Sequence, residues 1–201
     1  MKLARRDEVE LPSHRLPREV AEKIRLVILD VDGVLTDGGV YVGALPGGET
    51  LEMKRFDIQD GLGVKLLQWA GIEVAVVSGR ISQATEIRAR ELEIDEIHQD
   101  GGAQKIKAIQ GILDRRGLGW EDVAMLGDDL PDLAVLRRVG VPAAVANATE
   151  EVRKTALWQG RHSGGRGAVR EFCEAILRSR GEWEALVERY VTARSGDGEG
   201  K

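Results

Sequence analysis

Short apolar runs alternate along the chain with stretches whose apolar residues recur at helical spacing. The clearest run, Leu26-Val27-Ile28-Leu29, precedes a polar, glycine-rich segment, which is typical of a strand buried in a parallel sheet. The predicted strands end at Asp30 and cover Glu73 to Val77, about Glu96 to His98, Val123 to Leu126 and Ala143 to Val145. The predicted helices cover Pro17 to Lys23, Asp60 to Gly71, Ser82 to Leu92 with Ser82 as its cap, about Ala103 to Arg115 and Leu130 to Val139.

Strands that alternate with helices predict a doubly wound, mostly parallel α/β sheet. Two segments depart from this pattern. Residues 40–56 alternate apolar and polar positions around Pro46-Gly47-Gly48, which predicts an inserted β-hairpin, and a glycine-rich turn at 164–167 leads into one or two C-terminal helices. We expect one domain over 24–183, an N-terminal extension at 1–23, and a C-terminal helix with a disordered end at 184–201.

Composition narrows the choice of partners and compartment. The net charge of −5 argues against a nucleic-acid-binding protein, because phosphate backbones select basic surfaces. No run approaches the roughly 20 apolar residues of a membrane span. The sequence begins MKLARRDEVE, without an apolar signal region, and its single cysteine, Cys173, excludes an intrachain disulfide and is expected to be a buried structural thiol. These features favour a cytoplasmic protein.

The segment DVDGVLTDG, from Asp30 to Gly38, carries the first candidate chemistry. It follows the first predicted strand, and open α/β sheets bind their ligands at the carboxyl ends of their strands. Asp30 and Asp32 are two residues apart and can point toward one place above the sheet edge. Because two unpaired carboxylates so close would repel each other, the pair favours a divalent cation and a phosphate between them.

The later strand ends carry residues suited to the same chemistry. Ser78-Gly79-Arg80 follows the second core strand, where a hydroxyl and adjacent amides can bind a phosphoryl oxygen. Lys105 begins a helix and can neutralise charge on the same group. The third strand ends in GDDLPD, where Asp128 and Asp129 repeat the clustering of carboxylates. This order of residues, all at strand ends, is far more specific than any one of them.

This set of motifs resembles the haloacid dehalogenase (HAD) superfamily of phosphohydrolases, with DVDGVLTDG, VVSGR, Lys105 and GDDLPD as its four motifs. More narrowly, the chain resembles the capless 3-deoxy-D-manno-octulosonate 8-phosphate (KDO 8-phosphate) phosphatases. That match rests on LTDG, RFDIQDGLGVKLL, the helix after SGR, and GGRGAVRE, and the similarity covers about residues 24–183. It implies a Rossmann-like, HAD-type sheet without a cap domain.

The resemblance also implies a mechanism. Asp30 would attack phosphorus and form an aspartyl-phosphate, and Asp32 would protonate the departing sugar oxygen and then activate water. Mg²⁺ would be held by the Asp30 carboxylate, the Asp32 backbone carbonyl and the Asp128 carboxylate.

Further residues complete the implied site. Ser78 and Lys105 would bind the transferring phosphoryl oxygens, and Asp129 and Asp132 would orient the metal's ligands and waters. Structural roles remain alternatives: Asp37 and Asp132 could form turns, Ser78 could cap one, and Lys105 could be a solvated helix residue.

Substrate recognition in the resembling family involves a second subunit. There the hairpin builds a homotetramer, and the glycine-rich tail of one subunit reaches the neighbouring site; the equivalents here are the hairpin at 40–56 and the tail at about 160–171. The expected substrate-binding residues are Gly33, Gly79, Arg80, Gln59, Arg166 and Arg170. A plain turn at 164–167, with Arg170 as a surface charge, remains the alternative.

The chain departs from the family pattern at a few positions. Gln59 stands where a basic residue usually precedes DG, the segment before Lys105 reads HQDGGAQK, and Asn147 replaces a frequent aspartate. These departures bear on the sugar rather than on the reaction, so a nonulosonate 9-phosphate is an alternative substrate. A signalling receiver domain is disfavoured because Asp32 follows Asp30 so directly, and a catalytically silent oligomerisation module is disfavoured because all four motifs are retained.

Overall fold

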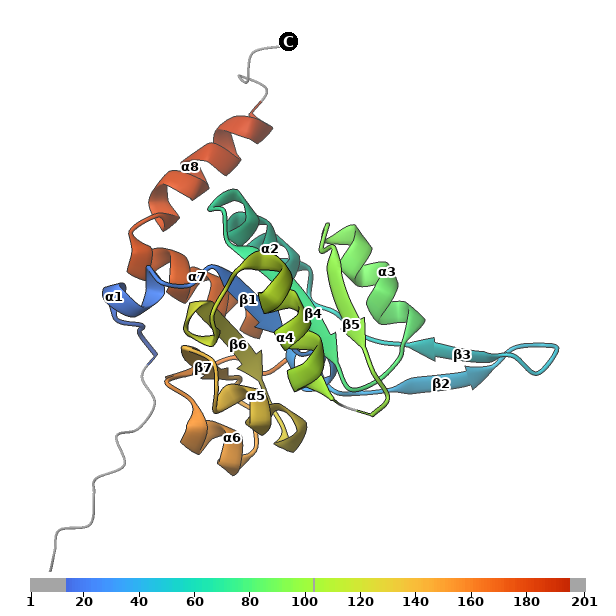
Figure 1. Ribbon diagram of the computed structural model, residues 1–201. Helices are drawn as coiled ribbons and strands as arrows, with labels where there is room; N and C mark the ends of the chain where they lie inside the picture. Colours follow the sequence, from blue (N-terminus) through green and yellow to red (C-terminus); the bar gives the residue numbers. More distant parts are fainter. Residues whose placement is uncertain (1–13, 103, 196–201) are drawn as a thin grey trace, which may run out of the picture.

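The computed structural model describes residues 14–102 and 104–195, and within them the main sheet has six parallel strands in the order β5-β4-β1-β6-β7-β8 (Figure 1). The strands are β1 Leu26–Leu29, β4 Glu73–Ser78, β5 Glu96–Gln99, β6 Val123–Gly127, β7 Val141–Ala144 and β8 Trp158–Gln159. This confirms the predicted doubly wound α/β sheet. Strand β8 was not predicted, because a two-residue strand carries no periodic signal of its own.

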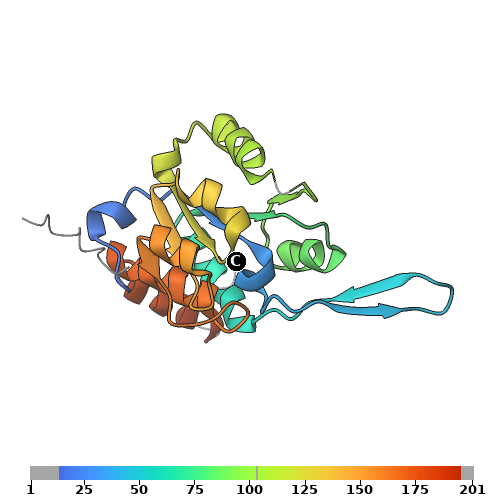
Figure 2. The ribbon, with the colours of Figure 1, turned by 90° about the horizontal axis from the view of Figure 1, so that it is seen from below.

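Helices cover both faces of the sheet, with α4 on one side and α7 on the other (Figure 2). They are α1 Arg18–Ala21, α2 Ile58–Trp69, α3 Gln83–Glu91, α4 Lys105–Arg116, α5 Leu133–Leu136, α6 Glu150–Thr155, α7 Ala168–Arg180 and α8 Trp183–Arg194. Helix α2 packs along α7, and the two share the same face of the sheet. Helix α2 begins at Ile58, ahead of the predicted start, because the Asp57 side chain accepts a hydrogen bond from the backbone N–H of Gln59 (2.9 Å).

Some predicted helix boundaries were wrong. The helix predicted over 130–139 is a 3-10 turn at Leu130–Asp132 followed by the single-turn α5, because Asp132 uses its side chain in the site described below instead of extending a regular helix. Ser82 occupies the N-cap position of α3, but its side chain makes no capping hydrogen bond. The predicted start near Ala103, the predicted disordered end beyond Ser195 and most of the N-terminal extension lie outside the described residues.

The predicted hairpin is present and projects away from the main body (Figures 1 and 2). Strands β2 Tyr41–Ala44 and β3 Thr50–Met53 pair antiparallel in a sheet of their own. An isolated antiparallel bridge between Thr36 and Phe56 fixes the returning chain beside the loop that follows β1. The hairpin's exposed apolar side chains are Val40, Tyr41, Val42, Leu45, Leu51 and Met53.

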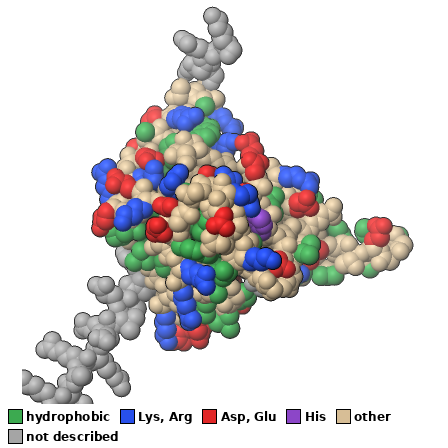
Figure 3. All heavy atoms as spheres, viewed as in Figure 1, with side chains coloured by type: hydrophobic (Ala, Val, Ile, Leu, Met, Phe, Trp, Pro, Cys, Tyr) green, Lys and Arg blue, Asp and Glu red, His purple; other side chains and the backbone are tan. Residues whose placement is uncertain are grey.

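The core is formed by the sheet and the inner faces of its helices. Cys173 on α7 is buried there as predicted, and burial raises the pKa of its thiol. Acidic and basic side chains are interspersed over the face seen in Figure 3. Among the described residues, no helix combines the length and apolar character that crossing a membrane requires.

Candidate active site

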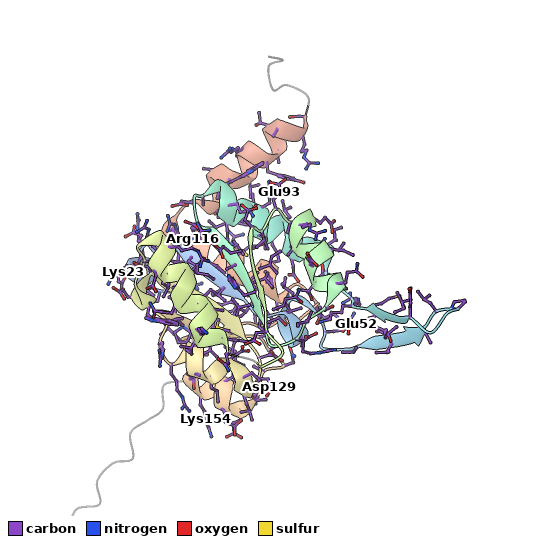
Figure 4. The ribbon with its side chains drawn as sticks, turned by 45° about the vertical axis from the view of Figure 1, so that its right-hand side comes forward. Lys23, Glu52, Glu93, Arg116, Asp129 and Lys154 are labelled. Carbon is purple, nitrogen blue, oxygen red and sulfur yellow. The ribbon has the colours of Figure 1, made fainter. Side chains whose placement is uncertain are left out.

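The carboxyl ends of β1, β4 and β6 adjoin because β1 lies between the other two strands. A cavity of about 240 Å³ opens at this edge, which is where parallel α/β sheets bind ligands. Asp129 lies at this edge of the molecule (Figure 4). The cavity is lined by Asp30, Asp32, Ser78, Gly79, Arg80, Lys105, Asp128, Asp129, Pro131 and Asp132. Nine of these ten residues were sequence-predicted site residues, and the fold brings them together.

Lys105 forms ion pairs with two of the carboxylates that line this cavity. Its Nζ donates to Asp30 Oδ1 (2.5 Å) and to Asp132 Oδ1 (2.6 Å), and all three side chains are buried. Burial alone would lower the pKa of Lys105, but the two carboxylates outweigh burial and hold that pKa above its ordinary value. Lys105 is therefore a buried cation, not a solvated helix residue.

Three carboxylates converge beside Lys105. Oxygens of Asp30, Asp128 and Asp132 lie within 4.8 Å of one another. Burial, with the neighbouring charge of Asp132 next, raises the pKa of Asp30 to about 6. Burial, with the charges of Asp30, Asp132 and Asp129 next, raises the pKa of Asp128 to about 8. One lysine does not balance this charge, and an all-oxygen cluster is the environment that a hard divalent cation prefers.

Asp132 differs from the other two carboxylates because its oxygens already have donors. Oδ1 accepts from Lys105, and Oδ2 accepts from the backbone N–H of Asp128 (3.0 Å). A carboxylate held at both oxygens is suited to orienting its neighbours. This geometry matches the orienting role expected for Asp132, although its oxygens are close enough to join the cluster.

The loop that follows β1 shapes the opening beside Asp128. Gly33 has a φ of +96°, and a Cβ built on it would lie 2.0 Å from Asp128 Oδ2. Only glycine fits this approach without displacing the carboxylate. Thr36 closes the loop by donating its hydroxyl to Val31 O (3.1 Å). Gly33 therefore acts by leaving space for the Asp128 side chain.

The Asp32 carboxylate is held by a residue that sequence reasoning missed. Lys54, which follows β3 of the hairpin, is completely buried at its side chain and donates to Asp32 Oδ1 (2.7 Å). Arg80 Nη1 lies 3.9 Å from the same oxygen, and Arg80 Nη2 donates to Glu52 Oε2 (3.1 Å) at the base of the hairpin (Figure 4). The only signal in the sequence was a lysine beside the RFDIQDGLGVKLL segment.

Ser78 ends β4 with its side chain buried at the cavity. Its Oγ accepts a hydrogen bond from the backbone N–H of Arg80 (3.1 Å), so the hydroxyl does stabilise the turn. An acceptor role leaves the hydroxyl proton available for an oxygen in the cavity. The two roles considered for Ser78 are therefore compatible.

The glycine-rich turn packs against the first loop of its own chain. The N–H of Gly165 donates to Val34 O (3.0 Å), and the N–H of Gly164 donates to Asn147 Oδ1 (2.8 Å). A Cβ on Gly164 would lie 1.8 Å from Gly33 O. These glycines therefore make contacts within the chain, and the expectation that the tail reaches a neighbouring subunit stays a prediction.

Four predicted substrate-binding residues do not line the cavity: Gly33, described above, and three others. Arg170 pairs with Glu174 (2.7 Å) and lies over the ring of Trp183. Gln59 is exposed at the start of α2, near the turn. Arg166 is exposed, and its side chain forms no ion pair with the residues that the structure describes.

Comparisons with known proteins show the family of the chain. Residues 96–171 match the model of the haloacid dehalogenase-like hydrolase family. The chain is 42% identical over 162 residues to the KDO 8-phosphate phosphatase KdsC of Escherichia coli K12, covering 81% of this chain and 84% of that protein. The chain belongs to the HAD-type KDO 8-phosphate phosphatase family.

Solved structures of this family have the same fold. The KDO 8-phosphate phosphatase of Moraxella catarrhalis, in complex with magnesium, phosphate and KDO, is similar with a TM-score of 0.80 at 37% identity, covering 86% of this chain and 97% of that one. The cobalt-bound phosphatase of Haemophilus influenzae is similar with a TM-score of 0.74 at 38% identity, covering 81% and 92%. The acidic cluster of this chain lies in the fold that holds metal in those two family members.

Proposed function

We propose that this protein is a cytoplasmic, Mg²⁺-dependent phosphomonoester hydrolase that acts on a phosphorylated sugar acid, KDO 8-phosphate first, through an aspartyl-phosphate. The observation that carries the proposal is the placement of Asp30, held by Lys105, beside Asp128 in one cavity with Ser78 and Asp32. A nucleophile, an acid and phosphoryl-binding groups are thereby within one substrate's reach.

The first step transfers the phosphoryl group to Asp30. An Asp30 oxygen forms a bond to phosphorus as the bond from phosphorus to the sugar oxygen breaks, and that bond's electron pair goes to the sugar oxygen. Asp32 supplies the proton that this oxygen takes up. Lys105 offsets the negative charge on the equatorial phosphoryl oxygens, and the Ser78 hydroxyl donates a hydrogen bond to them.

In the second step, water attacks phosphorus and the bond from Asp30 to phosphorus breaks. Asp32, now ionised, takes the water proton, so both catalytic carboxyls return to their starting states. Bound Mg²⁺ supplies positive charge for the phosphoryl oxygens. The Asp30 and Asp128 carboxylates and the Asp32 backbone carbonyl would hold the cation, while Asp129 and Asp132 would orient its surroundings.

The identity of the sugar is the finer part of the proposal. The named relatives favour an octulosonate 8-phosphate, whereas Gln59, which stands where the family usually has a basic residue, makes a nonulosonate 9-phosphate the second candidate. Gly33 and Gly79 shape the cavity, and Arg80 supplies charge at its edge. Arg166 and Arg170 remain candidates for the substrate carboxylate only after their side chains move.

The exposed apolar hairpin supports a homotetramer as part of the proposal. Its uncovered side chains stand clear of the main body, and exposed patches of this kind mark protein interaction sites. A second copy of the chain packed there would also help to cover the cavity, since residues 14–102 and 104–195 include no cap domain.

Phosphate release from a substrate panel tests the function. The panel contains KDO 8-phosphate, a nonulosonate 9-phosphate, a nucleotide and an aryl phosphate, each with Mg²⁺ and with a chelator. We expect Mg²⁺-dependent release, fastest from a sugar acid, and a loss of about 10⁴-fold or more in Asp30→Asn because the covalent route is removed. Release that is equally fast in Asp30→Asn would refute the nucleophile, and absence of release from every compound would refute the enzyme.

A further inference from the structure

Lys54 is the charged residue near the cavity that the mechanism above does not use. It follows β3, and the Thr36–Phe56 bridge two residues later fixes the chain beside the first loop. Its side chain is completely buried, and its ammonium group lies 2.7 Å from Asp32 Oδ1 and 3.8 Å from Glu52 Oε1. Burying a lysine ammonium group costs free energy that only a close partner can offset. The placement of Lys54 therefore requires an explanation.

The surroundings of Asp32 show what Lys54 does there. Among the described residues, Lys54 is the hydrogen-bond donor to the Asp32 side chain, and Arg80 at 3.9 Å is too distant for a hydrogen bond. The other carboxyl oxygen, Oδ2, is buried without a partner in the described structure. Among the described residues, the rotation of this carboxyl group about its side-chain bonds is therefore limited by one hydrogen bond, from Lys54.

We propose that Lys54 is a positioning residue that fixes the Asp32 carboxyl for proton transfer to the leaving oxygen, and that it makes the hairpin a part of the catalytic site. The inference rests on the proposed function, since it requires Asp32 to be the acid. It goes beyond that function by assigning a role in the chemical step to a hairpin residue. The balance of the step is unchanged: Asp32 gives its proton to the sugar oxygen, and Lys54 keeps all of its protons.

The substrate's leaving group separates this role from a merely structural one. A sugar alkoxide leaves poorly without a proton, whereas a nitrophenolate leaves well without one. The quantity kcat/KM reports the steps through transfer to Asp30, before the second step that both substrates share. A misplaced acid should therefore lower kcat/KM for a sugar phosphate much more than for p-nitrophenyl phosphate.

The experiment compares Lys54→Met, Lys54→Gln and Lys54→Arg with the unaltered protein on these two substrates. We expect Lys54→Met to lower kcat/KM for the sugar phosphate at least about tenfold more than for the aryl phosphate, part of the range that an acid supplies. Lys54→Arg, which keeps the charge, should recover most of that difference. Lys65→Met is the matched control, because Lys65 pairs with Glu93 on the outside of α2.

Each outcome decides the inference. An equal loss of kcat/KM on both substrates would mean that Lys54 only supports the fold. No loss of kcat/KM would mean that the ion pair between Lys54 and Asp32 does not contribute to the reaction. If Lys54→Met does not fold, judged by circular dichroism, the same ratio in Lys54→Gln decides. Asp32→Asn is measured in parallel. If kcat/KM falls selectively for the sugar phosphate in Asp32→Asn but not in the Lys54 variants, the role of Lys54 alone is overturned. If Asp32→Asn shows no such selective loss, the acid role of Asp32, on which the inference rests, is overturned.

Discussion

The half-buried Asp128 lies against two buried carboxyls, with one lysine to offset their charge. The pKa of Asp128 is raised to about 8 and that of Asp30 to about 6, in both cases chiefly by burial and then by neighbouring negative charge. A carboxyl whose pKa is higher in the folded than in the unfolded state stabilises the fold at low pH, and that contribution is lost as pH rises through the folded-state pKa. The metal-free protein should therefore lose stability over roughly pH 4 to 8.

The loss of stability with rising pH leads to a prediction about metal binding. A cation favours ionised carboxyls, so the increase in Tm on adding Mg²⁺ should grow from pH 5.5 to pH 8, roughly the window in which Asp30 and Asp128 would otherwise ionise. Thermal unfolding with Mg²⁺ and with a chelator measures the difference. Burial also raises the pKa of Asp60, which lies outside the acidic cluster, to about 6. Because Asp60 therefore also changes the absolute Tm with pH, the quantity to compare is the difference in Tm with and without Mg²⁺.

Asp128→Asn provides the comparison for that prediction. This variant removes one proposed metal ligand and one of the carboxyls with a raised pKa together, so its Mg²⁺-dependent rise in Tm should be small and nearly independent of pH. A rise as large and as pH-dependent as in the unaltered protein would place the metal elsewhere.

Sequence patterns predicted that Asp30, Ser78 and Asp128 lie together because each stands at the end of an apolar strand or directly after it, and strand ends meet in a parallel sheet. They did not locate Lys54, because its contact with Asp32 spans 22 positions and depends on how the hairpin returns. Asp60 was missed for the same reason. Its Oδ1 accepts from the N–H of Arg170, 110 positions away, at the first turn of α7. Pairings set by packing rather than by periodicity leave no local signal.

At the scale of elements, the turn before α7 joins the C-terminal part of the fold to the first loop. Gly165 has a φ of +62°, and a Cβ on it would lie 2.5 Å from the backbone N of Asp37. Gly181, which ends α7, has a φ of +74° and open space around its Cα. The two glycines share a positive φ but differ in their surroundings.

Alanine at these two positions separates strain from packing. Gly181→Ala should cost about 1 to 2 kcal/mol of unfolding free energy, from its left-handed backbone alone, with activity retained. Gly165→Ala should cost more, and it should also lower activity by displacing the first loop beside Asp32. Denaturant unfolding and phosphate release measure both effects. Equal losses of activity in the two variants would contradict the role of the turn.

The helix predicted over 130–139 was also affected by a contact that is distant in sequence. The pattern at 130–139 predicted one helix, yet the Asp132 carboxylate serves Lys105 and the N–H of Asp128, and the segment forms two short turns. Local propensity was overruled by a tertiary contact that the GDDLPD motif requires. The core strands, whose burial is set by their own apolar residues, matched their predicted positions closely.

At the scale of the whole molecule, the hairpin leaves apolar area exposed that the other described parts of the chain do not cover. Val42 is 69% exposed and Met53 is 55% exposed. If the hairpin builds the proposed homotetramer, replacing both with lysine should give a smaller species, because like charges would meet where apolar groups would otherwise be buried. Light scattering after gel filtration measures the mass.

A matched pair controls for added charge. Leu157→Lys with Val191→Lys changes two exposed apolar residues that lie outside the hairpin, and it should leave the mass unchanged. An unchanged mass in the hairpin variant, or a fall in both variants, would show that the hairpin is not the interface.

The contact between Gly164 and Gly33 also has a consequence for the order of folding. During synthesis the first motif leaves the ribosome early, but Asn147, Gly164 and Gly165, which fix its loop, emerge only near the end of the chain. Contacts so distant in sequence form late. A nascent chain can therefore assemble the central strands while the first loop still lacks its support, and the site becomes competent only when synthesis is almost complete.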